Sequence, residues 1–364
     1  HRDASTNSGY TSGDFIYNIF GTLDMGKGTI RLFTSYTSGN TKSTYLNVKD
    51  GGTLVVGDSI RLQMGQASGQ TCGIFPEAGS TVKFGQATGA TQFKNNIGAA
   101  TASFPATFSN LTIDNAAGLN YPTAFTVNGT LTLTNGKIAL GANNLTIGST
   151  GSIAGATATS YIVTDGAGVL VQTVPATTLK AFPVGTATSY DPVSVTPTTE
   201  SIFDVKVGTT LPAVAPSNYF YNEKVWNITP TTASSTLVAL TPSEVTSTAA
   251  NHVIGHYLND AYTNVAAVKS GNTYSATFTT FSPFVTGATD LGTGIDFVKN
   301  NFTISTNGNQ LVVNGTTAGQ AIVVYNAAGQ QIKQTLATND KTNVSLKSGL
   351  YFVKVNNQIL KVIL

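Results

Sequence analysis

Side chains that could hold a metal ion or transfer a proton are few in this 364-residue chain. His252 and His256 lie four positions apart in the segment 251–258. On a strand they would share one face about 13 Å apart, which is too far for one metal ion. A helix would bring them together, but Gly255 and the flanking aromatic residues oppose a helix. We therefore expect two histidines at the surface or at a sheet edge, and no metal site.

Paired carboxylates would indicate a polysaccharide-cleaving enzyme, because an acid and a base must flank one bond. The acids of the segment 1–160 are widely separated, without an Asp-x-x-Asp or Asp-Asp unit: Asp3, Asp14, Asp24, Asp50, Asp58, Glu77 and Asp114. A repeating fold can bring distant residues together, so a β-helical polysaccharide-degrading enzyme stays an alternative. Asp165, Asp191 and Asp260 have the oxygen ligands that calcium prefers, although such residues more often cap turns.

The sequence contains no nucleophile with its base, no phosphate loop and no cofactor fingerprint. We therefore predict that the protein is not an enzyme and that it has no cofactor. A different candidate is the aromatic group Tyr219, Phe220, Tyr221 and Trp226, because an exposed aromatic platform would bind a glycan. Turned inward, the same residues would form the core of a β-sandwich. We keep Tyr219, Tyr221 and Trp226 as candidate glycan contacts.

Composition excludes several classes of function. Charged residues make up 10% of the chain, compared with about 25% in an average soluble domain. The net charge of +2 and the scattered basic residues give no surface for nucleic acid. No run of eighteen or more apolar residues would span a membrane. Cys72 is the single cysteine, so no internal disulfide forms. The start at His1 suggests that a secretory leader has been removed.

Short alternating strands with turn residues between them predict an all-β protein. A Gly-(Thr/Ser)-apolar unit returns at intervals of about 20 to 30 residues, the range of solenoid repeats. In residues 125–140, two Asn-Gly turns bracket an alternation of apolar residues and threonines. We predict a right-handed parallel β-helix over residues 1–160, with aliphatic side chains inside, threonines outside, and Gly and Asn at the corners.

Near residue 161 the composition changes, and prolines become frequent. A proline cannot lie in a central strand, so these residues mark strand starts, edges and turns. We predict a separate β-sandwich over residues 161–290. The glycine-rich segment 287–294 is typical of a linker.

The C-terminal part of the chain contains short apolar strands that end in Leu350–Val355 and Ile359–Leu364. With the segments 309–315, 321–330 and 342–349, they resemble the type A C-terminal sorting domain of the type IX secretion system of Bacteroidetes. The resemblance covers residues 295–364 and implies an Ig-like sandwich that carries a cargo protein to the cell surface. The residues that match the sorting motif are Gly329, Gly349, Tyr351, Val353 and Lys361. Residues 296–301 depart from the Asn-Pro-rich beginning that is common in the family.

Two further features are similar to those of exported Bacteroidetes proteins. Residues 109–155 look like the solenoid rungs of large surface and adhesin-like proteins. Asp58-Ser59-Ile60 matches the short O-glycosylation sequon of such proteins, which makes Ser59 a candidate glycosylation site.

Together these patterns predict a structural or adhesive protein outside the cell, exported by the type IX secretion machinery. The weakly charged surface favours self-association, so we expect identical subunits to join head to tail into a filament. Strand addition at Ile359–Leu364 or at the strand-poor N-terminus would form the joint. Surface glycans are the alternative partner, through a carbohydrate-binding adhesin module.

Overall fold

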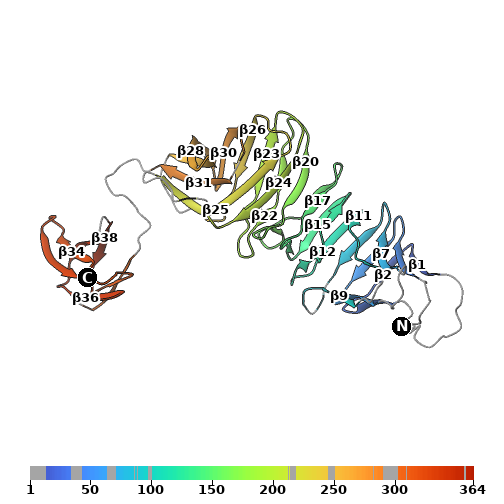
Figure 1. The fold of residues 1–364 in the computed structure, drawn as a ribbon, viewed down its shortest axis with the longest axis horizontal. Helices are drawn as coiled ribbons and strands as arrows, with labels where there is room; N and C mark the ends of the chain where they lie inside the picture. Colours follow the sequence, from blue (N-terminus) through green and yellow to red (C-terminus); the bar gives the residue numbers. More distant parts are fainter. Residues whose placement is uncertain are drawn as a thin grey trace. The chain divides into compact units, whose positions relative to one another are not determined.

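The computed structural model describes residues 14–33, 43–63, 71–85, 87, 89–96, 101–211, 213, 219–244, 251–281, 283–289, 302–308, 310–355 and 358–364. Every regular element within these ranges is a β-strand, which confirms the all-β prediction. Contacts divide the chain into two compact units (Figure 1). The first unit comprises residues 1–214, 221–248 and 252–287, and the second comprises residues 215–220, 249–251 and 288–364.

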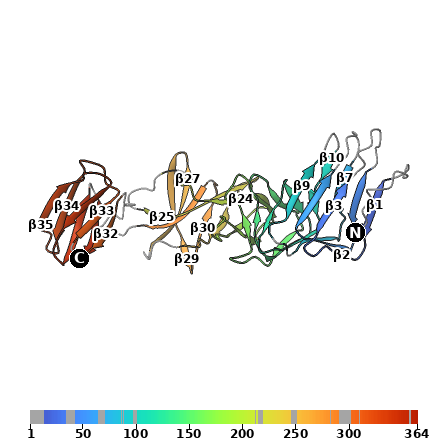
Figure 2. The ribbon, with the colours of Figure 1, turned by 90° about the horizontal axis from the view of Figure 1, so that it is seen from below.

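The first part of the first unit consists of parallel sheets (Figures 1 and 2). One sheet has the order β1 (Phe15–Ile19), β4 (Thr44–Val48), β7 (Thr71–Pro76) and β10 (Thr101–Ser103). Another has the order β2 (Thr22–Asp24), β5 (Thr53–Val56), β8 (Thr81–Phe84), β12 (Asn110–Asp114), β15 (Thr130–Asn135) and β18 (Ser152–Ala154). A shorter sheet has the order β3 (Thr29–Phe33), β6 (Ser59–Gln63) and β9 (Gln92–Asn96).

Alternation of aliphatic and hydroxyl side chains decides which side of each parallel strand faces the interior. In the sheet from β2 to β18, one inward position forms a row in register: Leu23, Leu54, Val82, Leu111, Leu131 and Ile153. The side chains from Leu54 to Leu131 are at most 2% exposed. The threonines at alternate positions are only partly buried, as in the pair Thr112 and Thr132. The predicted pattern of aliphatic residues inside and threonines outside therefore holds in this sheet.

The spacing between paired strands follows the predicted repeat. Thr22 lies opposite Thr53 on the neighbouring strand, and Leu111 lies opposite Leu131. The second separation falls within the interval that was expected for successive rungs of a solenoid, and the first lies just above it. Gly136, at one predicted Asn-Gly turn, has a φ of +85°. A Cβ atom there would overlap the carbonyl oxygen of Asn115, so only glycine fits this corner.

Two more parallel ladders continue past residue 160. One has the order β13 (Leu119–Asn120), β16 (Ile138–Ala139), β19 (Ile162–Val163) and β22 (Val184–Gly185). The other joins β11 (Thr107–Phe108), β14 (Phe125–Val127), β17 (Leu145–Ile147) and β20 (Leu170–Val174). Ile162 pairs in parallel with both Ile138 and Val184, so parallel pairing crosses the expected boundary at residue 160. The division into domains 1–160, 161–290 and 295–364 stays a prediction.

Antiparallel sheets form the rest of the first unit. β20 pairs in parallel with β17 and antiparallel with β24, so one sheet runs through both parts of the unit. That sheet continues as β24 (Ser201–Gly208), β25 (Tyr219–Pro230), β31 (Pro283–Thr289), β27 (His252–Leu258) and β28 (Ala261–Ala266). A neighbouring sheet has the order β21 (Lys180–Phe182), β23 (Val193–Pro197), β26 (Thr236–Leu240), β30 (Thr273–Phe278) and β29 (Val268–Ser270).

One continuous apolar core fills the first unit, from Ile19 near its beginning to Phe284 near its end. Trp226 of β25 and Tyr274 of β30 are fully buried in its antiparallel part. β31 extends to Thr289, so the first residues of the expected linker 287–294 are strand. The remaining linker residues and the segment 296–301 lie outside the described residues.

The second unit contains two antiparallel sheets. One has the order β32 (Thr303–Asn307), β33 (Gln310–Asn314) and β36 (Lys341–Ser345), and the other has the order β35 (Gln331–Leu336), β34 (Ala321–Asn326), β37 (Leu350–Val355) and β38 (Gln358–Ile363). Their inward side chains share a separate core that includes Leu311 and Val344 from the first sheet and Val324 and Val353 from the second.

Candidate functional site

The residues predicted from the sorting motif lie in the sheet formed by β35, β34, β37 and β38. Gly329 has a φ of +79° in the turn between β34 and β35, a conformation that glycine adopts without strain. The Asn326 side chain stabilises this turn, because its Oδ1 accepts hydrogen bonds from the main-chain N–H groups of Ala328 and Gln330 at 3.0 and 2.9 Å.

The motif residues near β37 connect the end of the chain to this sheet. The main-chain N–H and C=O groups of Gly349 both bond to Leu364, each at 3.0 Å. The Tyr351 ring lies against Gly349 and is 9% exposed, and its hydroxyl donates to the Lys347 carbonyl oxygen at 2.8 Å. Val353 is fully buried in the core. Gly349, Tyr351 and Val353 therefore stabilise the fold of the domain through hydrogen bonds and packing inside it.

Lys361 is the motif residue whose side chain is exposed. Lys361 lies on β38, opposite Phe352 of β37. β38 is an edge strand within the described part of the sheet. The neighbouring outward positions Ile359 and Ile363 are 47% and 70% exposed. Sequence reasoning identified the lysine and this strand but did not single out the two outward isoleucines, although their alternation with inward Leu360 and Val362 was a readable signal.

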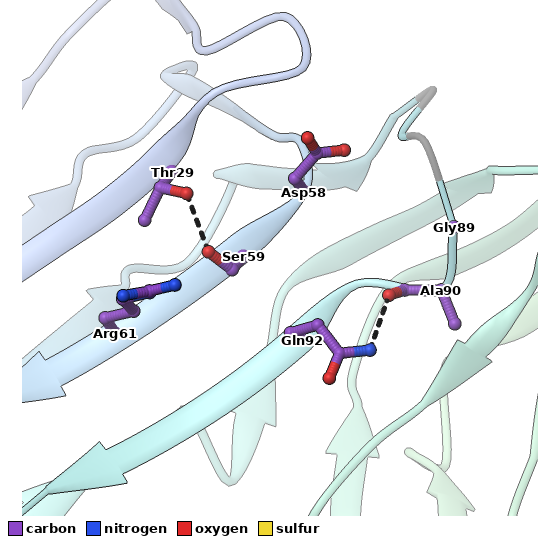
Figure 3. A pocket seen from close by; sticks show the side chains of 7 residues that line it. All are labelled: Thr29, Asp58, Ser59, Arg61, Gly89, Ala90 and Gln92. Carbon is purple, nitrogen blue, oxygen red and sulfur yellow. Dashed lines mark hydrogen bonds between the residues drawn. The ribbon is translucent and has the colours of Figure 1, made fainter.

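The candidate glycosylation residue Ser59 lies at the start of β6, in the first unit. Ser59 is 5% exposed, and its hydroxyl shares a 2.7 Å hydrogen bond with the Thr29 hydroxyl of β3. It lines an open polar hollow of about 390 Å³ (Figure 3). The lining residues are Thr29, Asp58, Ser59, Arg61, Gly89, Ala90 and Gln92. The Ser59 hydroxyl is therefore bonded inside a hollow and does not project from the surface.

Of the three aromatic residues predicted as glycan contacts, Tyr219 and Tyr221 are partly buried and Trp226 lies in the core. Trp226 is fully buried, and its Nε1 donates to the Asp191 carbonyl oxygen at 2.9 Å. Tyr221 is partly buried, with its ring against Tyr262 and its hydroxyl 2.6 Å from Asn264 Oδ1. The prediction of glycan contact is wrong for Trp226, because the alternation of β25 turns its indole into the core.

Two of the aspartates considered for calcium bind the protein's own main chain. Asp191 is fully buried, and its carboxylate accepts hydrogen bonds from the Ser189 hydroxyl at 2.6 Å and the Ser243 N–H at 2.8 Å. Asp165 accepts from the Ala187 N–H at 2.8 Å. Both contacts fix loops, which is the turn-capping role that the sequence favoured.

The two histidines lie on one face of β27, as expected for a strand. His256 is 4% exposed and stacks on Phe284, with ring centroids 4.8 Å apart. Its expected place at the surface or at an edge is wrong, because this face of β27 packs against the aromatic residues of β30. Burial lowers the pKa of His256. Burial, and secondarily the charge of Lys269, lower the pKa of His252, whose ring contacts Tyr274.

Comparisons with known proteins bear on the second unit above all. A protein-family model described as "Secretion system C-terminal sorting domain" matches residues 298–363. No curated protein matches the chain significantly. Among solved structures, the chain is similar to the adhesin domain of Epf from Streptococcus pyogenes, with 10% identity and a TM-score of 0.14. That likeness covers 48% of this chain and 76% of the other, and at this TM-score it carries no argument.

The family match and the placement of the motif residues define residues 298–363 as a domain that directs a protein into a secretion pathway. The chain is a cargo of the type IX secretion system, exported to the cell surface or the extracellular space, as the sequence predicted. Its partner in export is the type IX machinery. Within the described residues, no helix is long and apolar enough to cross a bilayer.

Proposed function

We propose that this cargo is a non-catalytic structural or adhesive protein, whose copies join head to tail outside the cell. Its parts would be a right-handed parallel β-helix, a β-sandwich and an Ig-like sorting domain. The parallel registers support the β-helix, because successive strands of one sheet are separated by a full circuit of the chain through the other sheets.

The observation that carries the proposal is the end of the first unit formed by β1, β2 and β3, which we call the open end because no described strand covers it. Within the described residues, β1, β2 and β3 each pair with a single strand. Leu23 is 37% exposed, although Leu54, which occupies the same position in the next strand, is fully buried. Tyr17 is 50% exposed, whereas its neighbour Leu46 is 6% exposed. The inward rows therefore end in apolar side chains that no described strand covers.

An end of this kind favours association, because exposed strand edges and apolar side chains pair readily with another chain. Phe20, 73% exposed beside the same end, enlarges the apolar surface. Among the described residues, β38 pairs on one side only and exposes Ile359 and Ile363, which supplies an apolar edge in the other unit. Contact between two different surfaces generates a filament when the rotation from one copy to the next does not close into a ring, and the proposal is the filament.

The test is the concentration dependence of particle length for the purified full chain, measured by light scattering and electron microscopy. We expect the unmodified protein to form elongated particles that lengthen with concentration, and Leu23→Lys to prevent their formation. Leu237→Lys is the matched control, because Leu237 is 43% exposed on β26, away from the open end. Particles of monomer size at every concentration, or equal assembly of both variants, would refute head-to-tail joining.

A further inference from the structure

Two edge strands of this chain carry the same pattern of outward side chains. β1, at the open end of the first unit, pairs with β4 alone among the described strands. Ile19 points inward and is 8% exposed, so the alternate residues Ile16 and Asn18 lie on the outer face. Ile16 is 56% exposed, and Phe20, directly after the strand, is 73% exposed. The outer side of β1 is therefore apolar, polar and apolar in turn.

β38 is the second such strand, and it pairs with β37 alone among the described strands. Val362 points into the core of the sorting domain and is 9% exposed. Ile359, Lys361 and Ile363 therefore lie on the outer face. The two isoleucines are 47% and 70% exposed, and the lysine between them is exposed as well. The outer side of β38 thus repeats the order apolar, polar, apolar.

Main-chain groups of β1 also face away from its sheet. The Phe15 N–H donates to the residue just before β4, and the Ile19 carbonyl oxygen accepts from the residue just after β4. Successive residues of a strand direct their N–H and C=O groups to opposite sides. The main-chain groups of Ile16 and Asn18 therefore face the side of β1 that no described strand occupies.

The same reasoning applies to β38. Leu364 exchanges two main-chain hydrogen bonds with Gly349, each at 3.0 Å. In the antiparallel ladder with β37, every second residue before Leu364 bonds to β37 in the same way. The main-chain groups of Ile359, Lys361 and Ile363 therefore face the other side. Each of the two edges presents main-chain donors and acceptors at the same residues that carry the outward side chains.

We propose that β38 of one copy adds to β1 of the next copy as an antiparallel strand, with Asn18 opposite Lys361 and Ile16 opposite Ile363. This inference rests on the head-to-tail assembly proposed above and names the two strands that meet. The joint covers apolar side chains that are exposed in a single copy, and it pairs main-chain groups on both edges. Asn18 is uncharged, so Lys361 meets no like charge directly across the joint.

The faces of the two sheets decide the direction of pairing. In an antiparallel pair, residues that exchange main-chain hydrogen bonds lie directly opposite each other, with their side chains on one face. The outward side chains of both strands then meet, and both core faces lie on the other side. In a parallel pair, a residue bonds to the two neighbours of the residue opposite it. Ile16 would then lie opposite Leu360 or Val362, which would put an outward side chain on the core face of the sorting domain.

β1 fits β38 better than the other two strands at the open end do. β38 has six residues and β1 has five, so the two can pair along nearly their whole length. β2 has only three residues. β3 has five, but its outward residues Thr29 and Arg31 are polar and do not match the isoleucines of β38.

The experiment adds one cysteine to each strand in full-chain variants and measures disulfide-linked dimers after treatment with oxidised glutathione. Directly opposite residues of a hydrogen-bonded antiparallel pair have Cα atoms about 5.5 Å apart, within the range of about 4.4–6.8 Å for a disulfide. We expect Ile16→Cys, mixed with Ile363→Cys, to form a mixed dimer that disappears on reduction. A tag on one variant distinguishes this mixed dimer by size. The native Cys72 is buried, and each variant alone gives the background.

Ile16→Cys mixed with Ile359→Cys is the matched control. Ile359 has the same side chain and lies on the same face of β38, but four residues from Ile363, or about 13 Å along the strand. It should give no mixed dimer above background. Equal cross-linking in both mixtures, or none in samples whose particles still lengthen with concentration, would overturn the strand addition and leave the filament standing. Unmodified protein that stays monomeric at every concentration would refute the assembly, and this inference with it.

A second variant tests the main-chain bonds of the joint. Lys361→Pro removes an N–H that faces the free edge and leaves the bonds to β37 in place, so we expect shorter particles. Gln334→Pro is the matched control on β35, the opposite edge strand of the described sheet. The Ala337 N–H donates to Gln320, so by alternation the main-chain groups of Gln334 also face away from β34. Hydrogen exchange of the sorting-domain amides checks that both variants are folded. Equal particle lengths in the two proline variants would count against the joint.

Discussion

Leu131 offers a direct test of the inward rows in the parallel sheets. It is fully buried on β15, between Leu111 of β12 and Ile153 of β18 in the same row. Leu131→Ala removes the branched end of the side chain and leaves a cavity, because neighbouring strands held by main-chain hydrogen bonds cannot close in. We expect the free energy of unfolding to fall by about 2–5 kcal/mol.

Thr132→Ala is the matched control, because Thr132 is the next residue of β15 and faces outward. Its loss should change the free energy of unfolding by about 0.5 kcal/mol or less. Urea unfolding of the full chain can be followed by the fluorescence of Trp226, the single tryptophan, which is buried in the first unit. The free energy of unfolding falls by about 3 kcal/mol per M urea in a protein of this size, so a variant that loses about 3 kcal/mol of this free energy unfolds at a midpoint about 1 M lower.

The reasoning would be refuted if the two variants lowered the midpoint equally, or if Thr132→Ala lowered it more. Either result would mean that Leu131 does not lie in a closely packed interior, and the assignment of inward and outward faces would then be wrong for this sheet.

Further predictions concern a corner, a buried ring and the sorting domain. Gly136→Ala should lower the thermal midpoint more than Gly141→Ala, because both glycines have positive φ but only Gly136 has a main-chain oxygen where the Cβ would lie. His256 has a pKa below its ordinary value of 6.5 because it is buried, so the unfolded chain takes up more protons as pH falls below 6.5. The free energy of unfolding should therefore decrease as the pH is lowered below 6.5, and this decrease should be less steep in His256→Phe. Identical pH profiles of the two proteins would contradict this. Tyr351→Phe removes the 2.8 Å hydrogen bond of the hydroxyl and should destabilise the sorting domain by about 1 kcal/mol in hydrogen exchange. Unchanged exchange of its amides would count against that contact.

Much of the architecture was readable from local pattern. Leu131 and Thr132 alternate in the sequence, and a strand turns successive side chains to opposite faces, so the inward and outward sets follow from the order of residues. The sorting domain was identified from its motif because Gly329, Gly349 and Tyr351 act within short segments, through a turn and contacts to neighbouring strands.

Other features depend on which strands become neighbours, and a local pattern does not contain that information. Trp226 and His256 look like surface candidates in the sequence, yet both are buried, because another sheet packs on their faces. Arg31 and Arg61 are far apart along the chain, and only the register of β3 on β6 makes them adjacent. The sequence by itself thus determined the strands and their faces, through the alternating geometry of the backbone. The tertiary structure decided the long-range register, because pairing between distant strands depends on the packing of the whole core.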